Sequence, residues 1–221
     1  MVRTGKRAAV LQMLLTRAGL SPASVPSAPR LSDLATTSVA ELDAIYSGLG
    51  GTPPMPRPRP GAWDMAFTDG LVVELDEELH FNRYRAQTLQ AFDAAVLPWH
   101  ADYLDYCTRH EPRCLVAGRW GRRWTTRPCE AMFGPPDRSE ISMVLGAPRW
   151  KQRALYDAVK DLIAIQASGP RLARVSVWDR LDGIVIGDAL DRKAVVDPER
   201  LAAFLAQRTC GATGLGRTLG S

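Results

Sequence analysis

The stretch AWDMAFTDGLVVELD, residues 62–76, constrains the fold more than any other part of this chain. Apolar residues recur at every second position, a period of two that is typical of β-strands whose two faces differ. The Thr-Asp-Gly segment in the middle breaks the alternation and offers a glycine for a tight turn. The pattern predicts a β-hairpin with strands at about residues 62–67 and 71–77.

The apolar pattern also selects the register of this hairpin. A two-residue turn would divide the apolar side chains between both faces, because a slip of one residue turns every side chain over. A three-residue loop, Thr68 to Gly70, with Gly70 in the left-handed conformation sets Asp64 directly opposite Glu74. The apolar residues then share one face: Trp63, Met65, Phe67, Leu71, Val73 and Leu75.

The opposite face carries Asp64, Glu74 and Asp76, in a chain whose net charge is +4. Opposed like charges destabilise a hairpin by roughly 0.2–1 kcal/mol, so something must offset them. Mg²⁺ and Mn²⁺ prefer carboxylate oxygens as ligands. We therefore expect these three carboxylates to hold Mg²⁺ or Mn²⁺. The alternative interpretation is a strand with one face in water, for which alternation means only inside and outside.

These acids resemble the pattern of the PD-(D/E)xK nuclease superfamily, in which an Asp ends one strand and a second acidic motif lies on the next. The closer resemblance is to the very-short-patch-repair endonuclease-like group, whose small members read roughly D-x-x-F and then E-x-D-G-x-x-H. The residues on these places are Asp64, Phe67, Glu74, Asp76 and His80. The resemblance covers roughly residues 38–95 and 171–209.

The resemblance implies an α/β fold with a three-layer restriction-endonuclease-like core, in which helices flank a central mixed sheet. It also implies metal-dependent hydrolysis of phosphodiester bonds in nucleic acid, with DNA as the first choice. Asp64, Glu74 and Asp76 would be the metal ligands, and His80 a catalytic acid, base or phosphate contact. A homodimer is compatible with this class.

One departure from the family pattern bears on activity. The usual lysine is missing, because Asp76 stands where it would be expected. Either a basic substitute such as Arg83, Arg85 or Lys151 is then required, or Asp76 itself acts as ligand or base. Otherwise the chain is a catalytically inactive nuclease-fold module that binds nucleic acid or a protein partner. A third alternative makes the same cations simple ion-pair partners of the carboxylates.

The expected nucleic-acid contacts follow the hairpin and open a later helix. Arg83 and Arg85 come just after the acidic motif, and Lys151 and Arg153 lie in the first turns of a helix predicted from Pro148. Free N–H groups at a helix start favour anions. The alternative for this helix is ordinary surface charge, with a buried stripe of Leu155, Val159, Leu162 and Ile163.

The cysteines offer a second metal hypothesis. Cys107, His110, Cys114 and Cys129 include the soft ligands of structural zinc. The first and third of these are seven residues apart, which is not the spacing of a standard zinc finger, so small buried cysteines are the preferred interpretation.

The rest of the chain predicts three segments. Residues 1–37 hold a helix at about 4–18 and a Ser/Pro-rich linker, residues 38–210 form a single nuclease-like domain with an insertion at about 98–147, and residues 211–221 are a flexible tail. Ser38 and Glu41 have the spacing of a capping box, and Asp197 followed by proline predicts a closing helix. No run is long enough for a membrane span, and we expect a cytoplasmic protein.

Overall fold

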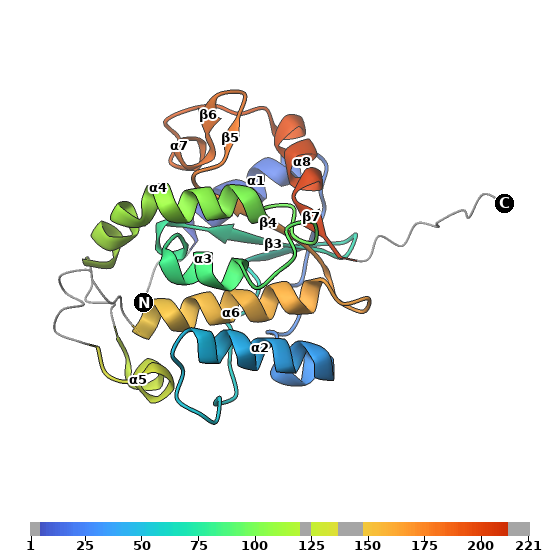
Figure 1. Ribbon diagram of the computed structural model, residues 1–221. Helices are drawn as coiled ribbons and strands as arrows, with labels where there is room; N and C mark the ends of the chain where they lie inside the picture. Colours follow the sequence, from blue (N-terminus) through green and yellow to red (C-terminus); the bar gives the residue numbers. More distant parts are fainter. Residues whose placement is uncertain (1–4, 120–124, 137–147, 212–221) are drawn as a thin grey trace.

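The computed structural model describes residues 5–119, 125–136 and 148–211 (Figure 1). At its centre lies a five-stranded mixed sheet in the order β1-β2-β3-β4-β7. The strands are β1 (Pro22–Ala23), β2 (Met65–Phe67), β3 (Leu71–Asp76), β4 (Arg171–Ser176) and β7 (Thr209–Cys210). A small second sheet pairs β5 (Arg180–Leu181) with β6 (Ile184–Val185). The expected α/β class is confirmed.

Helices cover both faces of this sheet (Figure 1). One face packs against α1 (Lys6–Arg17), α7 (Ile186–Leu190) and α8 (Pro198–Gln207). The other face lies under α3 (Arg83–Leu89), α4 (His100–Arg119) and α6 (Pro148–Ala164). Two further helices, α2 (Thr36–Gly48) and α5 (Arg127–Phe133), pack on the outer side of α6. None of the helices in the described ranges has the length and apolar character needed to cross a membrane.

The hairpin has the predicted register. Met65 pairs with Val73, so Asp64 stands opposite Glu74, and Gly70 adopts a left-handed φ of 80° in the three-residue turn. The apolar side chains from Met65 to Leu75 pack with α1 and α8 as expected. Trp63 is the exception, because it precedes β2 and packs on the other side of the sheet.

The acidic side chains on β3 are buried, so the interpretation of this strand face as one in water is wrong. Glu74 is 4 % exposed and Asp76 is 1 % exposed. Strand β4 runs parallel to β3 and sets Arg174 beside Glu74. A parallel neighbour requires a long crossover connection, and here the crossover contains α6, which lies over the acids.

The N-terminal helix is part of the core and not a separate segment. Leu11 and Leu15 of α1 are fully buried against the sheet. Helix α8 begins as predicted, since the Asp197 side chain accepts a hydrogen bond from the Glu199 amide at 2.9 Å. The predicted capping box of α2 is wrong, because the helix begins at Thr36, so that Ser38, the predicted cap, lies within its first turn.

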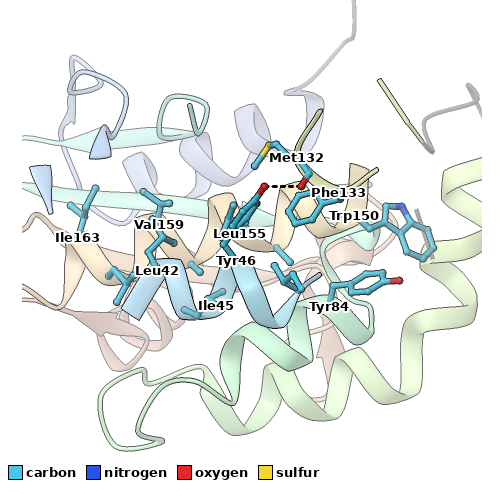
Figure 2. Close-up of a cluster of buried hydrophobic side chains, with 14 of the residues drawn as sticks. Leu42, Ile45, Tyr46, Tyr84, Met132, Phe133, Trp150, Leu155, Val159 and Ile163 are labelled. Atoms are coloured by element: carbon cyan, nitrogen blue, oxygen red, sulfur yellow. Dashed lines mark hydrogen bonds between the residues drawn. The ribbon is translucent and has the colours of Figure 1, made fainter. Parts of the chain in front are cut away.

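A second layer of core joins α2 to α6 (Figure 2). The predicted stripe of α6 lies in this core, with Leu155 and Val159 fully buried. The Tyr46 hydroxyl lies 2.7 Å from the carbonyl oxygen of Met132 and 2.8 Å from that of Thr52, and its one proton is shared between these two acceptors. These bonds tie α2 to α5 and to the linker that leads into the hairpin.

Two regions differ from the sequence expectations. Residues 98–147, the expected insertion, show no clear apolar period, but α4 is a helix of 20 residues that continues through Pro112. Its buried face against α3 and the sheet stabilises it where local pattern does not. The apolar residues from 183 to 190 suit a strand by composition, but only Ile184–Val185 is extended before α7 begins. The tail prediction lies outside the described residues from 212 onward.

Asp179 closes the turn that follows β4. Its carboxylate accepts hydrogen bonds from the Ser176 amide at 2.7 Å, the Tyr106 hydroxyl at 3.0 Å and the Arg208 guanidinium at 2.9 Å. The residue is fully buried. Burial raises the pKa of Asp179 from 3.8 to about 6, although Arg208 and the hydrogen bonds act in the opposite direction.

We predict that Asp179 makes the protein less stable as the pH rises from about 4 to 7. The folded protein holds this proton more tightly than the unfolded chain, so the contribution is full below about pH 4 and is lost as the pH rises through 6. The loss is at most about 3 kcal/mol. Urea unfolding at both ends of this range should show a smaller loss of stability in Asp179→Asn than in the wild type. Asp69→Asn, in the exposed hairpin turn, is the control, and equal profiles for all three proteins would contradict the prediction.

Candidate functional site

The acidic hairpin and the first turns of α6 line a pocket of about 990 Å³. Glu74 lines the pocket and is almost fully buried, so we take it as the floor of the pocket. Asp64 lines the same pocket and is exposed, at the pocket's edge. Gly5 and Ala8, from the start of α1, also line the pocket. Basic, polar and aromatic side chains contribute further lining: Arg59, Arg149, Gln152, Arg153 and Tyr156.

Lys160 of α6 binds the floor of this pocket. Its Nζ atom lies 2.8 Å from both carboxylate oxygens of Glu74 and 3.0 Å from the carbonyl oxygen of Ala62. The ammonium group also lies 5.2 Å from the ring centre of Trp63. A lysine from a helix that is distant in sequence therefore lies beside the acidic hairpin.

Asp64 is tied to the neighbouring strand. The Leu75 amide donates to its carboxylate at 2.9 Å, and the Asp64 amide donates to Glu74 at 3.2 Å. Burial raises the pKa of Glu74 to about 7, since it outweighs the lowering by Lys160, and the charge of Asp64 adds to the rise. The pKa of Asp64 is also raised, first because its carboxylate is partly removed from water against β3.

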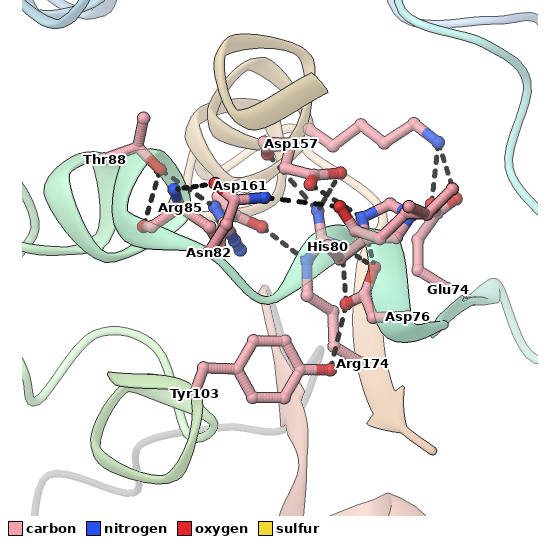
Figure 3. A network of polar contacts seen from close by, with 12 residues as sticks. Glu74, Asp76, His80, Asn82, Arg85, Thr88, Tyr103, Asp157, Asp161 and Arg174 are labelled. Atoms are coloured by element: carbon pink, nitrogen blue, oxygen red, sulfur yellow. Dashed lines mark hydrogen bonds and ion pairs between the residues drawn. The ribbon is translucent and has the colours of Figure 1, made fainter. Parts of the chain in front are cut away.

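Asp76 has a different set of partners (Figure 3). Both of its carboxylate oxygens accept hydrogen bonds from Nη1 of Arg174, at 3.0 and 2.9 Å, and the Tyr103 hydroxyl donates to one of them at 2.9 Å. Burial alone would raise the pKa of Asp76, but Arg174 and His80 hold it below the ordinary value. Asp76 is thus a buried, fully paired anion.

Three polar residues of α6 face the sheet at the helical spacing of three and four: Asp157, Lys160 and Asp161. Asp161 binds Nε of Arg174 at 2.7 Å and Nη2 of Arg85 at 2.8 Å. The side chains of Asp161, Arg174 and Arg85 are all buried. The carboxylates of Asp161 and Asp76 hold Arg174 between α6 and β3 (Figure 3).

His80 joins this network to the pocket. Its Nδ1 atom lies 2.8 Å from Asp157 and 3.1 Å from Asp76. Both contacts use the same ring nitrogen, and His80 lines the pocket, so Nε2 is the nitrogen available to a ligand there. Burial would raise the pKa of Asp157, but His80 and Arg174 lower it well below the ordinary value.

Two places in the described residues merit comparison as cation sites. Ligand atoms of Asp76, His80 and Asp157 lie within 4.8 Å of one another, but Arg174 already occupies Asp76 from one side. Asp64 and Glu74 form the second place. Lys160 binds both carboxylate oxygens of Glu74 there, whereas Asp64 has no ion-pair partner among the described contacts. The predicted trio of carboxylates is therefore divided, and Asp76 belongs to the buried network.

The predicted nucleic-acid contacts are also divided. Arg153 lines the pocket. Arg83 binds Glu111 at 2.7 Å on the surface, and Lys151 lies over the Tyr84 ring at 5.4 Å. Arg85 is 1 % exposed, so a contact with nucleic acid is wrong for this residue. None of the three proposed substitutes binds Glu74 or Asp76 in the described contacts, where Lys160 and Arg174 take that place.

The described cysteines do not gather as the zinc hypothesis requires. The Cys129 thiol lies against Thr126 and Gln152, at 2.9 and 3.2 Å. Cys114 accepts a hydrogen bond from the Asn82 side chain. His110 stacks on Trp178 with 4.0 Å between ring centres. In the described part of the chain, the cysteines lie buried with free thiols.

Sequence reasoning missed the cationic partners of the acids and part of their support. The missed residues are Tyr103, Asp157, Lys160, Asp161 and Arg174. The sequence shows that Asp157, Lys160 and Asp161 share one face of a helix, but two acids and a lysine on one helix face equally suit a surface in water. Only the burial of both sides of α6 decides between these interpretations.

A family model of unknown function, DUF7255, matches residues 44–192. The match covers more than half of the chain and contains the whole pocket floor and the buried network, so the chain belongs to the DUF7255 family. No curated protein matches the chain. No solved structure matches it either.

We predict that Arg174→Met destabilises the protein by about 3–5 kcal/mol, because it leaves buried carboxylates without their cation. Arg171→Met changes the same residue type on the same strand, but its partner Asp69 is on the surface, so it should cost less than about 1 kcal/mol. Urea unfolding of the three proteins measures the difference. Equal stabilities of the two variants would show that the network does not hold β4 to α6.

Proposed function

We propose that this protein is a metal-dependent phosphodiester hydrolase that acts on nucleic acid in the pocket between the acidic hairpin and α6. The observation that carries the proposal is the ion pair of Lys160 with Glu74, beside Asp64. It supplies the acid, acid and lysine of the nuclease motif, although the lysine comes from another element.

The topology supports a restriction-endonuclease-like core for this proposal. An antiparallel hairpin, β2-β3, carries the acids, and β3 then pairs with a parallel strand, β4, after a helical crossover. The later helix, α8, follows β4 and covers the sheet, as expected for that core. Helices on both sides of the sheet complete the three layers (Figure 1).

The donor set fits Mg²⁺ or Mn²⁺. Asp64 and Glu74 are two carboxylates that line one pocket, and the pKa of each is raised. The charge of Asp64 contributes to the raised pKa of Glu74. A cation between them would relieve this repulsion, and hard cations prefer such oxygens. When bound, the cation would stabilise the negative charge that develops on a phosphoryl group.

The chain's own residues have separate tasks in this proposal. Lys160 orients Glu74 and brings one positive charge to the phosphate in a low-dielectric site. Asp157 holds the imidazole of His80 through Nδ1, which presents Nε2 to the pocket for proton transfer. Asp76 acts through its partners only, because it is paired with Arg174 below the floor.

The first prediction of this proposal concerns hydrolysis. Fluorescently labelled DNA and RNA should be cleaved in the presence of Mn²⁺ or Mg²⁺, and Asp64→Asn, Glu74→Gln and Lys160→Met should each lower the rate by at least about 100-fold. Mn²⁺ binding, measured by calorimetry, should be lost in the first two variants. Glu74→Gln and Lys160→Met each remove one member of a buried ion pair, so urea unfolding must first show that each variant is folded.

Asp69→Asn is the matched control, since it changes an acid of the same hairpin outside the pocket. It should cleave and bind Mn²⁺ as the wild type does. Hydrolysis that persists in Asp64→Asn and Glu74→Gln would exclude this site as the catalytic one.

A second prediction concerns phosphate contacts in the linker before the hairpin. Arg59 lines the pocket and stands between two buried prolines, Pro58 and Pro60. Arg57 is exposed in the same segment and does not line it. Arg59→Ala should weaken DNA binding and lower the slope of affinity against salt by about one, whereas Arg57→Ala should change neither. Equal effects of the two variants would contradict a specific role for Arg59.

The alternative is a catalytically inactive module that binds nucleic acid or a protein partner. The bidentate contact of Lys160 with Glu74 favours it, because both oxygens are already paired. In that case DNA binding would survive Glu74→Gln, and no preparation would cleave DNA or RNA.

A further inference from the structure

We propose that the pocket takes an unpaired strand of nucleic acid and excludes a continuous duplex. This inference rests on the proposed function for its reaction, but it concerns which form of nucleic acid reaches the floor. The basis is the position of α1, whose first residues form part of the wall of the pocket together with the first turns of α6.

The wall is anchored by Arg7. Its guanidinium donates to both carboxylate oxygens of Glu78, at 2.8 and 3.0 Å, and to those of Asp191, at 2.7 and 3.0 Å. Such paired contacts of arginine with carboxylates have a defined geometry. The apolar side of α1 is anchored as well, through Leu11 and Leu15 in the core. The start of α1 is therefore held in place beside the pocket.

The depth of the pocket limits what can reach its floor. Glu74 is only 4 % exposed, in a pocket that residues from the starts of α1 and α6 both line. A duplex is stiff over many base pairs and cannot bend into a recess. A single backbone is flexible, so one of its phosphates can approach Glu74 where a continuous duplex would meet the pocket rim first.

The lining has the features that bind unpaired strands. Arg59, Arg149 and Arg153 bring positive charge for the phosphates, and Tyr156 adds an aromatic side chain to the lining. Single-strand sites combine a basic groove with aromatic rings on which bases stack. Unpaired bases can use such a ring, whereas bases within a duplex are already stacked and paired.

Fluorescence anisotropy without divalent cation tests the inference directly. The probes are one labelled DNA strand of non-self-complementary sequence, the same strand in a blunt duplex, and the same sequence as RNA. We expect the DNA single strand to bind at least about tenfold more tightly than the duplex at equal salt. The RNA arm shows whether the sugar matters. Equal or tighter binding of the blunt duplex, or binding of neither form, would overturn the inference.

Cleavage of the same probes with Mn²⁺ separates this inference from the proposed function. Faster cleavage of the single strand supports both. Cleavage of the duplex at an equal rate supports the hydrolase and refutes the exclusion of duplex. A single-strand preference in binding, with no cleavage of any probe, supports the inference and refutes the hydrolase.

Two variants test the structural reasons. Arg7→Gln releases the start of α1, so the preference for single strand over duplex should fall by at least about threefold relative to Arg17→Gln, which removes the same charge from the other end of α1. Tyr156→Leu keeps apolar bulk but removes the ring, and should weaken single-strand binding by about tenfold. An unchanged preference in Arg7→Gln, or unchanged binding in Tyr156→Leu, would refute the corresponding part of the inference.

Discussion

The pairing of one guanidinium with carboxylates from two elements is the interaction on which the site depends. Arg174 of β4 binds Asp76 of the neighbouring strand and Asp161 of α6, and all three side chains are at most 1 % exposed. A buried charge without its partner costs several kcal/mol, so strand and helix are held at one spacing. The same spacing brings Lys160, one position before Asp161, onto Glu74.

As a consequence, the acids of the hairpin lie in two different environments. Asp76 belongs to the structural network below the floor, whereas Asp64 and Glu74 face the pocket. His80 contacts both parts, since its ring is held by the network and lines the pocket. Burial raises the pKa of Glu74 to about 7, and its ion pair with Lys160 lowers that pKa only in part. The two acids carry more negative charge than the single nearby lysine compensates, and sites with such perturbed groups are often sites of binding or chemistry.

Much of the fold follows from local pattern. The hairpin register and the helices that start at Lys6, Pro148 and Pro198 are predictable, because alternation, proline and caps act within a few residues. Helix α4 is not predictable in this way, because it contains Pro112, its apolar pattern is weak and its stability comes from packing. The split of the three predicted metal ligands is also unpredictable, because Glu74 and Asp76 share a face but meet different cations.

By itself, the sequence determined that Asp64 and Glu74 oppose each other, because the period of two and a three-residue turn leave one register that keeps the apolar face together. Tertiary structure alone decided which cations meet these acids. Lys160 is 86 residues from Glu74, and Arg174 is 98 residues from Asp76. Electrostatic interaction depends on distance and burial in space, and both are set by how α6 packs on the sheet.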